Sequence, residues 1–270
     1  MSNIFNFKRF ANYLVYDLNN AKNNYGMSML VIGLLPFITF ACSQLMAWIV
    51  TPENLGQGFG IAIRVMTILM AIIVVELTAP SKLYGRLTER RYGSDWLQIP
   101  ASALEKFLSM LIMVCIVLPL AMCVLLLFSD TILALVFPAR YGENIFAVLN
   151  GINLFNLTIK KIPDATLHFN MIYICFLSWV NNILIFTLGS VVFKKAKVAK
   201  TILAVCAVGL VVGNVFGLFF NFTNSAMDFM MENNPFRAVN ILNNFVNITS
   251  VVEILLVGGG LYYRLRTIQH

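Results

Sequence analysis

Three charged residues, Arg64, Glu76 and Glu253, interrupt long hydrophobic runs. A charged side chain inside a bilayer marks an ion path, a proton relay or a pair between helices, because it is costly to leave unpartnered there. Arg64 and Glu76 stand near opposite ends of the same run, so their long side chains can reach the two membrane surfaces. We expect both to act as interfacial anchors.

Glu253 lies deeper in its run. It precedes Arg264 by eleven residues, which is about 16 Å along a helix and therefore near the middle of the bilayer. We expect Glu253 to contact another helix or to line a translocation path. If the last hydrophobic helix begins late in the sequence, Glu253 instead lies nearer the outer surface.

The sequence carries none of the spacings typical of nucleotide, metal or nucleophile sites. It has no Gly-x-x-x-x-Gly-Lys-Ser/Thr segment, so the chain does not build a P-loop of its own. The two histidines, His168 and His270, are far apart, and all five cysteines lie inside hydrophobic runs. We interpret the cysteines as packing residues. We therefore predict no catalytic residue, no metal site and no cofactor in this chain.

The composition excludes an ordinary soluble domain. Hydrophobic residues make up 59% of the 270 residues and charged residues 11%, with a net charge of +7. A soluble domain has about 45–50% apolar and about 25% charged residues. The basic residues lie in short loops beside hydrophobic runs, so membrane topology explains the positive charge more simply than nucleic-acid binding does.

Six hydrophobic runs have the length of about 20 residues that a membrane helix needs. They cover residues 27–50, 59–79, 107–128, 169–193, 201–220 and 245–263. Residues 1–26 precede them with apolar residues at helical spacing and a polar opposite face, which predicts an amphipathic interfacial helix that turns into the bilayer near Tyr25 and Gly26. The fold class is all-α, a single transmembrane domain over residues 1–270. We also expect a helical piece over 143–157.

The positive-inside rule orients these spans. Fourteen lysines and arginines fall on the side that holds both ends of the chain, and four fall on the other. We therefore predict that both termini are cytoplasmic.

Residues 81–106 connect the second and third runs and hold eight charged residues, five of them basic. They also contain large apolar side chains, among them Leu83, Tyr84 and Trp96. We interpret this loop as an amphipathic segment at the cytoplasmic membrane face that meets a partner. The alternative is that its apolar side lies in the lipid headgroups.

Gly209, Gly213 and Gly217 recur at every fourth residue of the fifth run. Small residues at this spacing form a groove in which another helix approaches closely. The partner helix belongs to the same chain or to a second subunit.

The layout of the whole chain resembles the membrane subunits of ABC-2 type transporters. These have an amphipathic N-terminal helix, six spans, a cytoplasmic loop between spans two and three, and an outer helical element before the last span. The local resemblance lies at residues 97–108, Leu-Gln-Ile-Pro-Ala-Ser-Ala-Leu-Glu-Lys-Phe-Leu. Pro-Ala-Ser followed by Glu-Lys-Phe before span three is similar to a pattern in many bacterial permeases of this type.

This resemblance implies a permease of the bacterial inner membrane that works as a homodimer or heterodimer. A separate cytoplasmic ATPase would bind ATP and Mg²⁺ and supply the energy for export. The loop between spans two and three would carry the coupling helix that docks on the ATPase. By position, this role falls on Arg86, Leu87, Glu89, Arg90, Arg91 and Tyr92.

Three other functions compete with this one. A secondary transporter predicts several buried ionisable groups and internal repeats. A membrane sensor or assembly protein predicts no ATPase partner. An intramembrane enzyme needs a catalytic pair, and none is evident in the sequence.

Overall fold

The structure is a computed structural model. It describes residues 5–50, 60–88, 93, 96, 98–145, 147, 157–162, 165–169, 171–214 and 235–268. Within these ranges, six helices are long and apolar enough to cross a membrane: Phe7–Ile49, Ile61–Leu83, Ala103–Val136, Tyr173–Val192, Lys197–Asn214 and Val246–Ile268. The chain is therefore a multi-pass membrane protein, and the six predicted spans are confirmed.

The first span is built from α1 (Phe7–Gly33) and α2 (Leu35–Val50). The Asn6 side chain caps α1 by accepting hydrogen bonds from the backbone N–H groups of Lys8 and Arg9. The expected turn near Tyr25 and Gly26 is not present, since α1 runs through both residues as one helix. The interruption falls at Leu34 instead, two residues before Pro36, because the proline ring has no N–H to continue the helix ladder.

The second and third spans are α3 (Ile61–Leu83) and the succession α5 (Ala103–Ile112), η3 (Met113–Val117) and α6 (Leu118–Val136). A short 3₁₀ helix, η2 (Gly85–Thr88), follows α3. The η3 segment is a single π turn directly before Pro119. A wider turn at this point accommodates a proline that cannot donate to the preceding turn.

The connection after α6 differs from the expectation. It begins with the short helix α7 (Pro138–Tyr141) and contains an antiparallel hairpin, β1 (Leu157–Ile162) with β2 (Ala165–Phe169). Residues 148–156, which make up most of the helix expected over 143–157, lie outside the described residues. The chain is predominantly helical, but the all-α prediction missed this hairpin.

The last three spans are α9 (Met171–Val192), the helix Lys197–Asn214 and α11 (Pro235–Ile268). The turn between the first two contains Ala196 with a positive φ of 49°. Pro235 is the first residue of α11, a position where the missing N–H costs no helix hydrogen bond. The last helix thus starts ten residues before the predicted run at 245.

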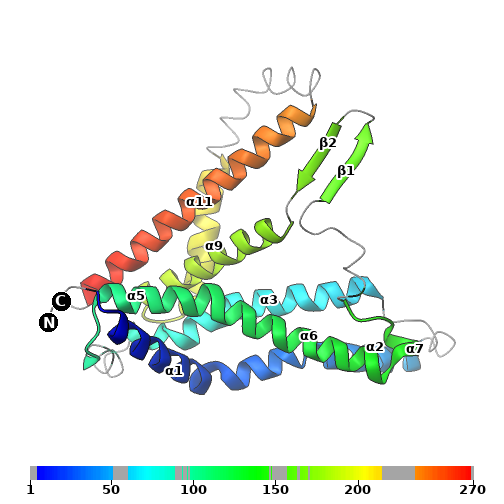
Figure 1. Cartoon of the computed structure of the whole chain (residues 1–270), viewed down its shortest axis with the longest axis horizontal. Helices are drawn as coiled ribbons and strands as arrows, with labels where there is room; N and C mark the ends of the chain where they lie inside the picture. The colour runs from blue at the N-terminus through cyan, green and yellow to red at the C-terminus, as the bar shows by residue number, and fades with distance from the viewer. Residues whose placement is uncertain are drawn as a thin grey trace.

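The helices form a bundle from which the C-terminal ones diverge (Figure 1). The α1 helix packs along α3, α5 and α6, and α9 joins the bundle through α3 and η3. The α11 helix packs on α9 and on α5, where the rings of Phe107 and Tyr262 lie 5.4 Å apart. The hydrophobic core runs between α1, α3, α5, η3, α6 and α9.

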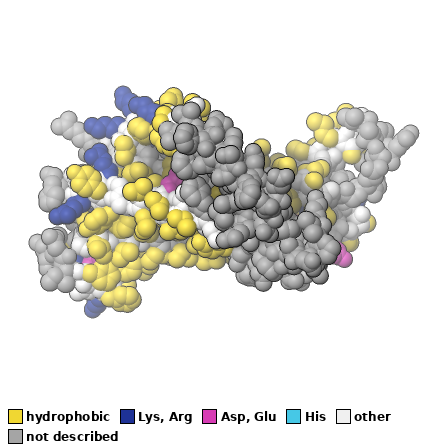
Figure 2. Space-filling model, turned by 90° about the horizontal axis from the view of Figure 1, so that it is seen from above, with side chains coloured by type: hydrophobic (Ala, Val, Ile, Leu, Met, Phe, Trp, Pro, Cys, Tyr) yellow, Lys and Arg dark blue, Asp and Glu magenta, His cyan; other side chains and the backbone are white. Residues whose placement is uncertain are grey.

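Charge is distributed unevenly along the long axis of the molecule. Figure 2 shows lysine and arginine gathered at the end where α1 begins and α11 ends, with hydrophobic side chains over the adjoining body. Many large hydrophobic side chains on the helices are exposed, including Met27, Leu203 and Leu256. Such side chains are stable against lipid, and the charged end suits the water interface.

Candidate functional site

The segment that follows α3 is fixed to two separate parts of the bundle. The Lys197 ammonium donates to the Gly85 carbonyl, and the Arg86 guanidinium donates to the Asn24 side chain with an N–O distance of 3.1 Å. Lys197 begins the fifth span and Asn24 lies in α1. The start of the predicted coupling region therefore contacts both the first and the fifth spans.

Gly93 lies against the end of η2. A Cβ atom placed on Gly93 would lie 2.9 Å from the Leu87 carbonyl oxygen, so the backbone at these two positions is in close contact. Leu87 packs against the hydrophobic core. The predicted docking residues Glu89, Arg90, Arg91 and Tyr92 lie outside the described residues.

A cavity of about 170 Å³ lies beside this segment. Arg86 and Leu87 line one part of it, and Asp17 and Asn20 of α1 line another. Trp96 also contributes to the wall, and its indole N–H donates to the Tyr13 hydroxyl at 3.0 Å. The predicted coupling region thus borders a polar cavity whose other wall is α1.

Three residues, Arg9, Ser102 and Glu105, form a polar latch between α1 and α5. Arg9 donates from Nε and Nη2 to the two Glu105 carboxylate oxygens, each at 2.7 Å. Glu105 also accepts from the backbone N–H groups of Asn6 and Ser102, at 2.9 and 2.8 Å. The Ser102 hydroxyl completes a capping box by accepting from the Glu105 N–H. The fully buried Glu105 carboxylate is therefore satisfied by four donors.

A second polar contact joins α1 and α5 further along the two helices. The buried Asp17 carboxylate accepts from the Tyr84 hydroxyl and from the Ser109 hydroxyl, both at 2.9 Å. Burial and the neighbouring Asp17 carboxylate raise the pKa of Tyr84 well above its ordinary value. Tyr84 therefore keeps its proton and donates a hydrogen bond to Asp17. Through Tyr84 and Ser109, Asp17 joins α1 to the end of α3 and to α5.

Lys106, next to the latch, is 1% exposed. Its ammonium donates to the Trp96 carbonyl at 2.8 Å and lies 4.2 Å from the centroid of the Trp96 ring. The Pro-Ala-Ser and Glu-Lys-Phe residues that carry the family resemblance are thus structural. They start α5, fasten it to α1 and fix the end of the loop that follows η2.

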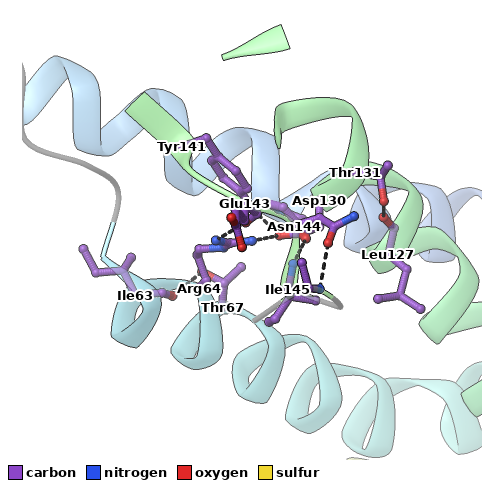
Figure 3. A network of polar contacts seen from close by, with 12 residues as sticks. Ile63, Arg64, Thr67, Leu127, Asp130, Thr131, Tyr141, Glu143, Asn144 and Ile145 are labelled. Carbon is purple, nitrogen blue, oxygen red and sulfur yellow. Dashed lines mark hydrogen bonds and ion pairs between the residues drawn. The ribbon is translucent and has the colours of Figure 1, made fainter. Parts of the chain in front are cut away.

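The opposite end of the bundle holds a buried ion pair, drawn in Figure 3. Arg64 is 4% exposed, and its Nη2 atom lies 2.8 Å from Oδ1 of Asp130 in α6. Asp130 also accepts from the Tyr141 hydroxyl at 2.6 Å and from the Ile145 N–H at 2.7 Å. The Arg64 guanidinium carbon lies 4.3 Å from the Tyr141 ring centroid, and its Nη1 donates to the Glu143 carbonyl. The expectation that Arg64 is an interfacial anchor was therefore wrong.

Glu76 and Glu253 are both bound by asparagines of α9. Asn182 donates to Glu76 at 3.3 Å, and Asn181 donates to Glu253 at 2.8 Å. Glu76 is 7% exposed, so the anchor expectation was wrong for this residue as well. Glu253 is exposed, and its expected contact with another helix is present in the Asn181 bond. A role of Glu253 in a translocation path stays a prediction.

The two described glycines of the predicted packing motif have no close neighbour among the residues that the structure describes. A Cβ atom on Gly209 or Gly213 would meet nothing within 4 Å, and Gly217 lies outside the described residues. The close approach occurs at Gly189 of α9, where a Cβ atom would lie 2.8 Å from the Thr201 Cβ. A contact of Gly209 and Gly213 with a second subunit stays a prediction.

Sequence reasoning missed two carboxylates, Asp17 and Asp130. Asp17 belongs to the polar face of a helix that was expected to lie on the membrane, and Asp130 falls just past the expected end of the third span. Asp17 is bound by Tyr84 and Ser109, which are far away in the sequence, and Asp130 has one such distant partner, Arg64. No group of three or more His, Cys, Asp or Glu side chains that could hold a metal occurs among the described residues.

No protein-family model, curated protein or solved structure matches this chain.

Proposed function

We propose that this protein is the membrane-spanning permease subunit of an ABC-type exporter. In this proposal a separate cytoplasmic ATPase binds ATP and Mg²⁺, and the chain pairs with a second permease subunit. The six spans and the concentration of basic residues at one end are consistent with this role, and the sequence has no P-loop of its own.

The observation that carries the proposal is the anchoring of the segment after α3. Lys197 and Asn24 hold its two consecutive residues Gly85 and Arg86. A force applied to this segment by a partner reaches the first and fifth spans together, because each is bonded to it directly. A conformational change in the ATPase would thereby move two helices that are separated by the rest of the bundle.

The test is co-purification with the ATPase that is encoded nearest to this chain. Both proteins are co-expressed, and the complex is isolated through a tag on the permease alone. We expect the ATPase to be recovered with the unaltered chain and to be lost with Arg90→Glu/Arg91→Glu. The matched control is Lys194→Glu/Lys195→Glu, a charge reversal of two exposed residues in another loop at the same end. Equal recovery of the ATPase with Arg90→Glu/Arg91→Glu would refute the docking assignment.

A secondary transporter is the second candidate, and one observation favours it. Glu76 and Glu253, on different helices, are bonded to adjacent asparagines of α9, an arrangement that suits ion or proton coupling inside a membrane. In this case vesicles that contain the protein would transport substrate in response to an ion gradient without ATP. The double variant Glu76→Gln/Glu253→Gln would abolish the coupling of substrate transport to the ion gradient.

A further inference from the structure

A hydrophobic groove of about 640 Å³ lies on the outside of the bundle, between α1 and the succession η3–α6. On the α1 side its wall extends from Leu18 to Leu30, and on the other side it extends from Met113 to Leu125. These helices run in the same direction, because Arg9 pairs with Glu105 near their starts and the Ser129 hydroxyl donates to the Gly33 carbonyl further along. The groove therefore runs parallel to both helices and extends over twelve residues of each.

The length of the groove matches one leaflet of a membrane. Twelve residues of helix measure about 18 Å, and half of the hydrocarbon core of a bilayer is about 15 Å. The floor contains the buried Tyr25, Met29 and Met113, whereas Met27 at the rim is 76% exposed. An extended acyl chain fits such a trough, with one side on protein and the other on the surrounding lipid.

One end of the groove is polar and cationic. Asn19 and Lys22 line it beside Leu18, and the far end at Leu30 and Leu125 is hydrophobic. Lys22 is exposed, and it has no ion-pair or hydrogen-bond partner among the residues that the structure describes. An ammonium at the polar end of an acyl-sized groove attracts an anionic headgroup.

We propose that this groove binds one anionic membrane phospholipid. An acyl chain lies between α1 and α6, and the headgroup phosphate contacts Lys22 and the Asn19 amide. The π turn η3 contributes Met113 and Val117 to the wall, and π turns of this kind recur at functional sites. The bound lipid would cover the edge of the core at Tyr25, Met29 and Met113 and bridge α1 to η3 and α6. This site does not depend on the proposed transport function.

The experiment measures bound lipid by native mass spectrometry. The purified protein is equilibrated with equal amounts of phosphatidylglycerol and phosphatidylcholine that have identical acyl chains. We expect one tightly retained lipid, with phosphatidylglycerol preferred. Lys22→Gln should reduce this preference about fivefold, the effect of one lysine near an anionic headgroup. Lys200→Gln, which removes an exposed lysine outside the groove, should leave the preference unchanged.

A second variant tests the acyl portion. Gly26 lines the groove, and a Cβ atom there would contact only the Lys22 Cγ at 3.8 Å. Gly26→Leu therefore fills the groove without a clash and raises helix propensity. It should remove the retained lipid, whereas Gly259→Leu, at an exposed glycine of α11 with open space around its Cβ, should not. An unchanged lipid count in Gly26→Leu, a lipid held without preference for phosphatidylglycerol, or a change in oligomeric mass in place of lipid loss would each overturn the proposal.

Discussion

Glu105 combines full burial with four hydrogen-bond donors, two from the Arg9 side chain and two from backbone N–H groups. A buried carboxylate is stable only when its oxygens are satisfied to this degree. Without Glu105, each of the four donor groups would need water or another acceptor. The carboxylate therefore satisfies the hydrogen-bonding capacity of Arg9 and of two backbone N–H groups.

This arrangement predicts a graded loss of stability. Ser102→Ala removes the bond to the Glu105 N–H alone, and the loss of an N-cap of this kind costs about 1 kcal/mol. Glu105→Ala removes the acceptor for all four donors and should lower the melting temperature of the detergent-solubilised protein clearly further. Lys8→Ala, which removes an exposed side chain of α1 next to Arg9, is the control. An equal loss of stability in Ser102→Ala and Glu105→Ala would show that the Arg9–Glu105 ion pair does not stabilise the fold.

The sequence pointed to two of the buried charged residues, Arg64 and Glu76, but not to their partners. Arg64 and Glu76 stood out because charged residues are rare in hydrophobic runs, yet both were interpreted as anchors. The reason is that Asp130 lies 66 residues from Arg64, and Asn182 lies 106 residues from Glu76. Pairing over such separations depends on which helices become neighbours, and the periodicity of a single run does not contain that information.

For the packing of helices, the place of a glycine relative to a neighbouring helix matters more than its spacing along the sequence. Gly209 and Gly213 have the spacing of a packing motif but no close neighbour in the described part of the chain, whereas Gly189 belongs to no such motif and faces Thr201. The turn at residues 193–196 brings α9 and the fifth span together at this point. A close approach of two helices requires a small residue where they cross, and one residue is sufficient.

Gly189→Ala should therefore destabilise the protein. The added Cβ would lie 2.7 Å from the Thr201 Cγ2 and 2.8 Å from its Cβ, and overpacking of this kind costs about 1–3 kcal/mol. Thermal unfolding in detergent measures the effect. The matched control is Gly209→Ala, which should be neutral or slightly stabilising. Thr201→Ala should partly rescue Gly189→Ala, and a failure of this rescue would contradict the contact.

The lengths of the hydrophobic runs predicted the six spans, because the thickness of the bilayer sets the minimum length of a membrane helix. The hairpin was missed, although Leu157, Ile159, Leu167 and Phe169 alternate with polar residues around Pro163 and Asp164, a pattern typical of paired strands. The break at Leu34 lies inside the run predicted over residues 27–50, two residues before Pro36, whose ring cannot continue the helix ladder.

For the whole molecule, the two ends differ in charge. The positively charged end carries the start of α1, the end of α11 and the loop between α9 and the fifth span. Lys195 belongs to that loop, and Ala139 lies in α7 at the opposite end. Both side chains are exposed, so each accepts a cysteine label without disturbing the core.

Labelling of intact cells with a membrane-impermeant maleimide tests the prediction that the charged end is cytoplasmic. Ala139→Cys should react at once, and Lys195→Cys should react only after the membrane is permeabilised. The unaltered chain, with its five native cysteines, gives the background. The reverse pattern would place both ends of the chain outside the cell.

The polar latch also has a consequence for the order of events during synthesis. Arg9 and Glu105 are 96 residues apart, and at about 5–20 residues per second the ribosome needs about 5–20 s to progress from one to the other. Until then the first helix has no α5 to hold it, and Arg9 must remain in water or among headgroups. The segment carries Lys8, Arg9, Asp17 and Lys22, so its polar side is compatible with water or lipid headgroups throughout this delay.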